Sequence, residues 1–133
     1  MHSSFFTSIL ALLLFATFST AHVVGITAPA TVKAGKKFNI MFQTENFIQT
    51  YSDEYVMIGA HLTTSTTCDT CIGTPLAYID LHAQGHSDTG PGNNFLESIT
   101  IPSAGLYNIT ATITSMISGE IGVYFFWTTV KVT

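Results

Sequence analysis

The chain alternates between apolar and polar residues with a period of two over much of its length. In the segment 36–44, Phe38, Ile40 and Phe42 occupy alternate positions, and Asn39, Met41 and Gln43 occupy the positions of the other face. The segment 106–114 shows the same alternation. A period of two places successive side chains on opposite faces of an extended strand. We therefore predict seven strands, at residues 23–28, 36–44, 54–62, 75–82, 95–101, 106–114 and 121–132.

The composition of the chain from His22 onward supports this reading. Its 112 residues include 18 Thr, 12 Ile and 7 Val, whereas Leu occurs only five times. β-branched residues pack well on a pleated sheet and lose rotamer freedom in a helix. About seven short strands in roughly 110 residues, with no convincing amphipathic helix, are typical of an immunoglobulin-like sandwich. We therefore predict an all-β fold with a single immunoglobulin-like β-sandwich.

The first 21 residues have the pattern of a secretory signal peptide. The apolar run 5–18 is shorter than the roughly 20 residues that a membrane-spanning helix needs. Ser19-Thr20-Ala21 follows it and matches a small-x-small cleavage motif. A buried N-terminal helix is the alternative interpretation. We predict cleavage between Ala21 and His22, which leaves residues 22–133 as one secreted domain without stable membrane insertion.

The charge balance narrows the classes of protein to which the chain can belong. Charged residues make up 9% of the sequence, the formal net charge is −4 and arginine is absent. A disordered chain would be more highly charged, and a nucleic-acid-binding surface needs clustered cations to contact phosphates. We therefore expect a folded protein that binds no nucleic acid, and we expect a monomer.

Cys68 and Cys71 form a C-x-x-C motif within a threonine-rich segment. A redox-active pair would be expected to precede a helix in a βαβ unit. A zinc site would need a second pair of ligands at similar spacing. Because neither context is present, we expect the two cysteines of a secreted chain to form a disulfide with each other. Redox-active, free or intermolecular thiols are the alternatives.

Cleavage after Ala21 would make His22 the first residue of the mature chain. Its amine and imidazole could then chelate copper with a second histidine, since imidazole suits copper. The candidate partners are His61, His82 and His86. His82 and His86 have i,i+4 spacing, but Gly85 and the polar residues after it favour a loop over a metal-binding helix. A small copper protein is therefore kept only as an alternative, and we expect no metal and no other cofactor.

The sequence contains no convincing set of catalytic residues. Asp88-Thr89-Gly90 matches the tripeptide of aspartic proteases, but that chemistry needs two such carboxylates in apolar surroundings. A nucleophile elbow and a glycine-rich phosphate loop are both missing. We expect the protein not to be an enzyme.

Asn108-Ile109-Thr110 is the sole N-glycosylation sequon of the chain. The alternation in 106–114 points Asn108 away from the core, where an oligosaccharyl group could be accommodated. We therefore predict Asn108 as a glycosylation site.

Five blocks of sequence resemble one known family when they are taken together. The block Thr44–Gln49, with the sequence Thr-Glu-Asn-Phe-Ile-Gln, is the most specific of them. The others are Gly25–Gly35, Ile99–Pro102, Gly105–Ser115 and Val130–Val132. They resemble the fungal necrosis-inducing secreted protein family of plant-directed effectors, in order and over essentially the whole chain after the signal peptide.

The resemblance implies a non-enzymatic virulence effector that a fungal pathogen secretes and that enters the host cytoplasm. It implies binding to host receptor-like kinases and receptor-like cytoplasmic kinases, which lowers kinase activity and suppresses pattern-triggered plant immunity. Some members of the family also provoke host cell death. Glu45, Asn46 and Gln49 are our candidates for the partner-binding surface. An extracellular adhesion or glycan-binding module is the alternative function.

Overall fold

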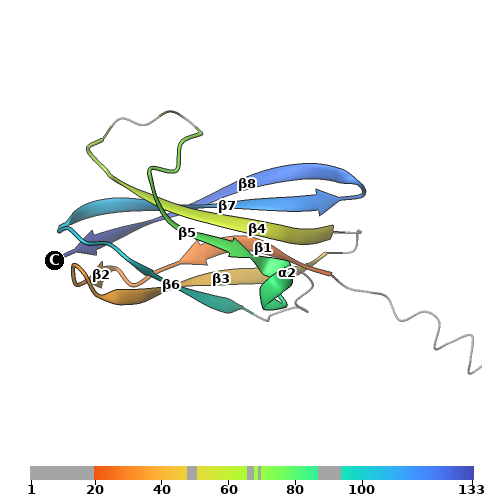
Figure 1. Ribbon diagram of the computed structural model, residues 1–133, viewed down its shortest axis with the longest axis horizontal. Coiled ribbons are helices and arrows are strands. Elements are labelled where there is room, and N and C mark those ends of the chain that lie inside the picture. Colours follow the sequence, from red (N-terminus) through yellow and green to blue (C-terminus); the bar gives the residue numbers. More distant parts are fainter. Residues whose placement is uncertain (1–19, 48–50, 66–67, 69, 87–93) are drawn as a thin grey trace, which may run out of the picture.

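The computed structural model describes residues 20–47, 51–65, 68, 70–86 and 94–133. These residues form two β-sheets packed face to face (Figure 1). The smaller sheet has the strand order β1-β3-β6, and the larger sheet has the order β2-β8-β7-β4-β5. The predicted all-β, immunoglobulin-like sandwich is therefore confirmed.

The bounds of the strands are as follows. The three-stranded sheet contains β1 (Thr20–Thr27), β3 (Lys37–Phe47) and β6 (Phe95–Thr100). The five-stranded sheet contains β2 (Thr31–Val32), β4 (Tyr51–Leu62), β5 (Thr74–Asp80), β7 (Gly105–Ile117) and β8 (Glu120–Val132). Neighbouring strands are antiparallel except β2, which runs parallel to β8.

The structure corrects the sequence prediction on β5 and on the residues that follow it. The predicted strand 75–82 ends at Asp80, and a short helix, α2 (Leu81–Gln84), begins there. The Asp80 side chain accepts a hydrogen bond of 3.0 Å from the Ala83 backbone N–H, which caps the helix. Gly85 ends it in the left-handed conformation, with φ of 73°. His82 therefore lies on a helical turn rather than in the loop that we predicted.

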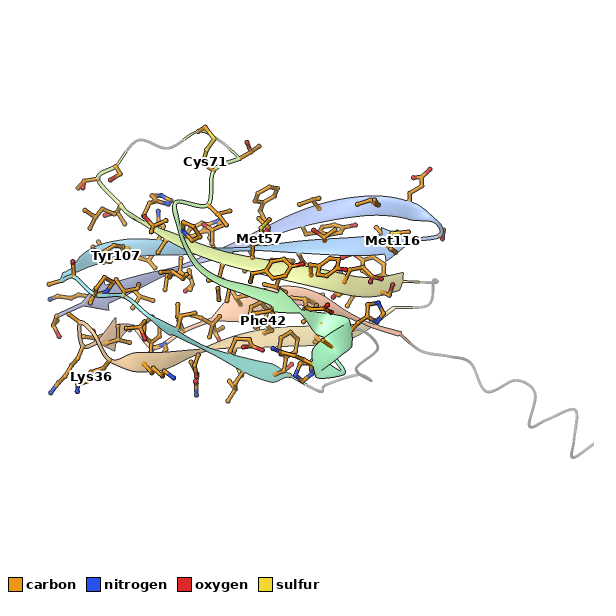
Figure 2. All side chains as sticks on the ribbon, viewed as in Figure 1. Lys36, Phe42, Met57, Cys71, Tyr107 and Met116 are labelled. Atoms are coloured by element: carbon orange, nitrogen blue, oxygen red, sulfur yellow. A yellow bond between two sulfur atoms is a disulfide. The ribbon has the colours of Figure 1, made fainter. Side chains whose placement is uncertain are left out.

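The hydrophobic core lies between the two sheets. Ile40 and Phe42 of β3 face Ile58 of β4 and Ile109 of β7, and all four side chains have no exposed surface. The ring of Phe42 stacks on Phe95, with 4.8 Å between their centroids, and Figure 2 shows Phe42 between the layers. The inward-facing positions predicted from the alternation in 36–44 and 106–114 are thus confirmed.

A β-bulge in β4 changes which side of the sheet its residues face. Asp53 is opposite Ser115 of β7, whereas Tyr55 is opposite Thr114, so Glu54 is the extra residue. A bulge of this kind re-aims the side chains on either side of it. As a result, Asp53 is buried between the sheets, and the Tyr55 side chain is exposed.

The described helix is far too short to cross a membrane, and the same holds for any helix in the described ranges.

Candidate functional site

Large apolar side chains gather on the face of the five-stranded sheet that is turned away from the core. The strand register places Tyr78, Met57, Thr112 and Phe125 side by side across β5, β4, β7 and β8. We call this surface the outer-face patch and define it by its exposed apolar members: Tyr55, Met57, Tyr78, Ile121, Val123, Phe125 and Trp127. Threonines of β7 lie in register between the apolar residues of β4 and those of β8. Exposed apolar side chains gathered on one face of a protein indicate a candidate interaction site.

The most exposed side chains of the outer-face patch are on β8 and β5. Trp127 is 68% exposed, Ile121 71% and Tyr78 65%. The Tyr78 ring stacks on that of Tyr55, with 5.7 Å between centroids and 19° between planes. Aromatic rings with exposed faces and few rotatable bonds are the groups that dominate binding energy at protein interfaces. The patch therefore has the composition of a binding surface.

A hollow of about 310 Å³ adjoins the patch where the Cys68–Cys71 loop passes over the sheet. Its lining comes from β4, β7, β8 and the loop, and consists of His61, Cys68, Cys71, Asn108, Thr110, Phe125 and Trp127. Figure 2 shows Cys71 and Met57 on this side of the sheet. The hollow combines aromatic walls with polar groups that can form hydrogen bonds.

Two glycines let the loop lie directly against β4. A Cβ atom at Gly59 would sit 2.4 Å from the backbone oxygen of Ile72, and one at Gly73 would sit 2.3 Å from that of Ala60. Gly73 also has a φ of 85°, which side chains other than glycine rarely adopt. The close approach of the two backbones thus fixes the position of the loop that walls the hollow.

The polar groups that line the hollow differ in whether they have hydrogen-bond partners. The Asn108 Oδ1 atom accepts a 3.0 Å hydrogen bond from the hydroxyl of Thr129. The Nδ1 atom of His61 is buried and has no hydrogen-bond partner among the residues that the structure describes. A buried polar atom without a partner costs free energy.

Cys68 and Cys71 form a disulfide, with 5.0 Å between their Cα atoms. Replacing both with alanine is expected to lower the free energy of unfolding by about 2 kcal/mol, since the bond closes only a short loop. Urea unfolding of the two proteins would measure this. A loss of more than about 4 kcal/mol, near the upper end for disulfides, would show that the loop supports the core rather than only the hollow.

A cluster of polar side chains lies between the two sheets, near the start of β1. Asp53 is 2% exposed and accepts three hydrogen bonds. They come from the backbone N–H of Val23 at 2.7 Å, the Ser115 hydroxyl at 2.6 Å and Nδ1 of His22 at 3.2 Å. The Tyr51 hydroxyl lies 3.1 Å from Nε2 of the same histidine. We call these four side chains, His22, Tyr51, Asp53 and Ser115, the inter-sheet cluster.

The inter-sheet cluster bears on the copper alternative. Both ring nitrogens of His22 are engaged by Asp53 and Tyr51, and the ring is 7% exposed. Among the residues described, no group of three or more His, Cys, Asp or Glu side chains is arranged to hold a metal ion. The geometry therefore assigns His22 a structural role and gives no support to a copper site.

Burial raises the pKa of the Tyr51 hydroxyl well above its usual value of about 10, and the nearby Asp53 charge adds to the rise. The neutral form is thus favoured in the folded state. The contribution of the Tyr51 hydroxyl to the free energy of unfolding is fully present below about pH 10. It decreases as the pH rises above about 10, because the hydroxyl then loses its proton in the unfolded chain but keeps it in the folded protein. We expect the free energy of unfolding to fall by up to about 1.4 kcal/mol per pH unit there.

The measurement is urea unfolding between pH 8 and pH 11, with Tyr51→Phe as the comparison. Phenylalanine cannot ionise, so the variant should start from lower stability but lose less of it as the pH rises. Parallel pH profiles for the two proteins would contradict this account of Tyr51.

Comparison with known families now identifies the chain. A sequence model described as "Nis1 family" matches residues 19–133. The chain belongs to the Nis1 family. Two relatives are each named "Necrosis-inducing secreted protein 1". The one from Colletotrichum orbiculare is 32% identical over 115 residues, covering 84% of this chain and 68% of the relative. The one from Colletotrichum higginsianum is 31% identical over 101 residues, covering 74% and 67%.

Solved structures are similar to this Nis1-family chain in fold alone. The CARDB domain of a Pyrococcus furiosus protein, solved with di-metal ions, matches with a TM-score of 0.53 and 16% identity. The match covers 88% of this chain and 92% of the domain. At such low identity the comparison supports the sandwich architecture of the Nis1-family chain and nothing about its ligands.

Of the predicted partner-binding residues of this Nis1-family chain, Glu45 and Asn46 lie on β3, in the other sheet from the outer-face patch. Glu45 is exposed near the end of β3, in the other sheet, opposite His22 in the strand register. Asn46 follows it on β3 and is opposite Ala21, while Gln49 lies outside the described residues, as do Asp88, Thr89 and Gly90. Glu45 and Asn46 therefore lie in a different sheet from the outer-face patch.

Sequence reasoning missed the outer-face patch in the Nis1-family chain. The segment Ile121–Trp127 is apolar at almost every position, so both faces of its strand are apolar. That pattern is typical of strands covered on both sides. In the structure only one face of β8 meets the core, which leaves Ile121, Val123, Phe125 and Trp127 exposed on the other.

Proposed function

We propose that this Nis1-family protein is a secreted fungal effector that suppresses plant immunity and promotes host cell death. The match of the family model to residues 19–133 carries the proposal, together with the two relatives named as necrosis-inducing secreted proteins. The signal-peptide pattern of residues 1–21 supports secretion. After secretion the protein enters host cells and binds receptor-like kinases and receptor-like cytoplasmic kinases, which lowers their activity.

The outer-face patch is the surface that we propose for the kinase contact. It offers Trp127, Tyr78 and Phe125 on a rigid sheet, and such anchors lose little conformational entropy when they are covered. Polar groups of β7, such as Asn108 and Thr110, lie beside these aromatic side chains. Protein interfaces combine apolar anchors with hydrogen-bonding groups in this way. Binding of this kind needs no catalytic residues, and we propose that the protein is not an enzyme.

The fold should be retained both outside the host cell, where the disulfide is formed, and in the reducing cytosol. Reducing conditions in the cytosol would open the Cys68–Cys71 disulfide. Both cysteines are exposed and lie in a loop outside the core. Loss of the bond would therefore leave the packed sheets in place, so the proposed activity in the cytosol does not depend on it.

The experiment is to express residues 22–133, with a start methionine, in leaf cytosol and to record the oxidative burst after a bacterial or chitin elicitor. A strongly reduced burst, relative to an inert protein that accumulates to the same level, is the expected result. Co-precipitation of receptor-like kinases from the same leaves would then identify the partner. An unchanged burst with normal accumulation of the protein would rule out the intracellular effector.

An extracellular glycan-binding module is the second candidate, and one observation favours it. The exposed indole of Trp127 stands beside Asn108, Thr110 and His61 in a hollow open to solvent. Sugar rings bind to aromatic faces flanked by hydrogen-bonding groups of this kind. Retention of the purified protein on chitin or plant cell walls, lost in Trp127→Ala, would favour this function over kinase binding.

A further inference from the structure

One edge of β8 has unpaired backbone over most of its length. On one side the strand pairs with β7 from Glu120 to Val132. On its other side it pairs with β2 at Lys131 and Val132 alone. The backbone from Glu120 to Val130 thus has no strand partner on that side among the described residues. In Figure 1 the β7–β8 hairpin extends well beyond β2.

The turn between β7 and β8 determines which residues present this free backbone. Ser118 and Gly119, with φ of 50° and 86°, form a two-residue turn between the paired residues Ile117 and Glu120. In such a hairpin the two flanking residues exchange hydrogen bonds, so the even-numbered residues of β8 bond to β7. The odd-numbered residues point their N–H and C=O groups to the open side. The N–H of Lys131 follows this rule, since it donates to the Ala30 carbonyl of the neighbouring segment at 3.0 Å.

The open edge lacks the features that normally prevent strands from pairing between molecules. Natural edges carry lysines, prolines or bulges for this purpose. The segment Ile121–Thr129 contains no charged residue and no proline, and its register with β7 is regular. The same odd-numbered residues carry the exposed side chains Ile121, Val123, Phe125 and Trp127. An edge of this composition is expected to be covered in solution.

We propose that a second copy of this chain covers it, by antiparallel pairing of β8 with β8 about a two-fold axis at Phe125. Phe125 is the middle residue of the open segment Glu120–Val130. In this register Phe125 faces Phe125 of the second copy, Val123 faces Trp127 and Ile121 faces Thr129. Every odd-numbered residue of the open edge then finds a hydrogen-bonding partner, and no pair involves the positions that β2 occupies. The proposal replaces the monomer expected from the sequence and does not depend on the proposed function.

The side chains agree with this pairing. Directly opposed residues of an antiparallel pair point to the same face of a sheet, so the two outer-face patches would join into one surface. Aromatic and β-branched residues form favourable cross-strand pairs, and here Phe125 meets Phe125 and Val123 meets Trp127. Antiparallel pairing also brings the strand end that carries Glu120 beside the end that carries Lys131 of the second copy. Parallel pairing would place like charges together.

A cysteine placed on the proposed axis tests the register directly. Opposed Cα atoms in a hydrogen-bonded pair are about 5.5 Å apart, within the range of about 4.4–6.8 Å that a disulfide spans. We expect Phe125→Cys of the protein comprising residues 22–133 to form a covalent dimer under mild oxidation. Val123→Cys is the matched control, because its two copies would lie about 14 Å apart along the strands. Equal cross-linking of both variants would contradict the register.

Sedimentation of the unmodified protein tests the association itself. We expect twice the monomer mass at micromolar concentration. Val123→Lys should weaken the dimer at least tenfold, because it places a charge on the edge, whereas Met57→Lys, on the same face but in the inner strand β4, should not. A monomer at every concentration would overturn the proposal. Equal loss in both variants would show instead that the molecules stack through their outer faces, and would also overturn it.

Discussion

Replacing Asp53 with alanine is expected to lower the free energy of unfolding by about 3–5 kcal/mol, because it leaves several buried hydrogen-bond donors without their acceptor. The carboxylate receives the Val23 N–H, the Ser115 hydroxyl and Nδ1 of His22, all within 3.2 Å. Its loss would leave these three donors buried without an acceptor, and each such group costs about 1–3 kcal/mol. Because domains of this size are stable by only about 5–15 kcal/mol, much of the fold's stability depends on this residue.

Urea unfolding of Asp53→Ala beside Asp80→Ala would check this prediction. Asp80 caps the short helix α2 with a single hydrogen bond to Ala83, and loss of such a cap costs about 1 kcal/mol. Asp53→Asn should fall between the two, because the amide keeps one acceptor oxygen in the same place. If Asp53→Ala lost no more stability than Asp80→Ala, the inter-sheet cluster would not hold the sheets together.

Trp127→Ala is expected to weaken the proposed binding to a kinase by about 2 kcal/mol or more, the threshold for an interface hot spot. That corresponds to roughly a 30-fold higher Kd. The side chain of Trp127 is 68% exposed on the outer-face patch, so the same change should alter the free energy of unfolding by no more than about 0.5 kcal/mol. A large effect on binding and a small one on folding is the pattern of a contact residue.

The measurement is binding of a co-precipitated kinase to the purified protein, together with the oxidative burst in leaves. Leu96→Ala is the matched control, since Leu96 is 58% exposed on β6, in the other sheet. Leu96→Ala should leave both readouts unchanged. If Leu96→Ala and Trp127→Ala weakened binding equally, or if neither did, the outer-face patch would not be the kinase-binding surface.

Most strands could be predicted from the sequence because their apolar and polar residues alternate locally, as in 36–44 and 106–114. The predicted strand at 106–114 lies within β7, and that at 121–132 is nearly β8. β2 escaped prediction because two residues carry no period. The end of β5 was misplaced because Asp80 and Gly85 act as helix caps only once the chain between them turns.

The inter-sheet cluster could not be predicted in the same way. His22 and Asp53 are 31 residues apart, and Asp53 and Ser115 are 62 apart. Only the strand order brings them together, and only the bulge at Glu54 turns Asp53 toward the core. A single sequence gives no sign of the bulge, so Asp53 would have been assigned to the surface like most aspartates.

The hollow beside Trp127 could not be predicted from the sequence either. The C-x-x-C motif predicts a closed loop, but not the side of the sheet on which the loop lies. That side depends on the contact of Gly59 and Gly73 with backbone atoms of the opposite segment. A close contact between a strand and a loop produces no periodic pattern of apolar and polar residues in the sequence.

If the predicted cleavage after Ala21 takes place, the burial of His22 links the maturation of the protein to its folding. Cleavage after Ala21 would make a residue of the sandwich interior the first residue of the chain, with its ring already held by Asp53 and Tyr51. A cut one residue further on would remove that ring and leave a gap in the inter-sheet cluster. The position of the cut would then affect the stability of the mature protein.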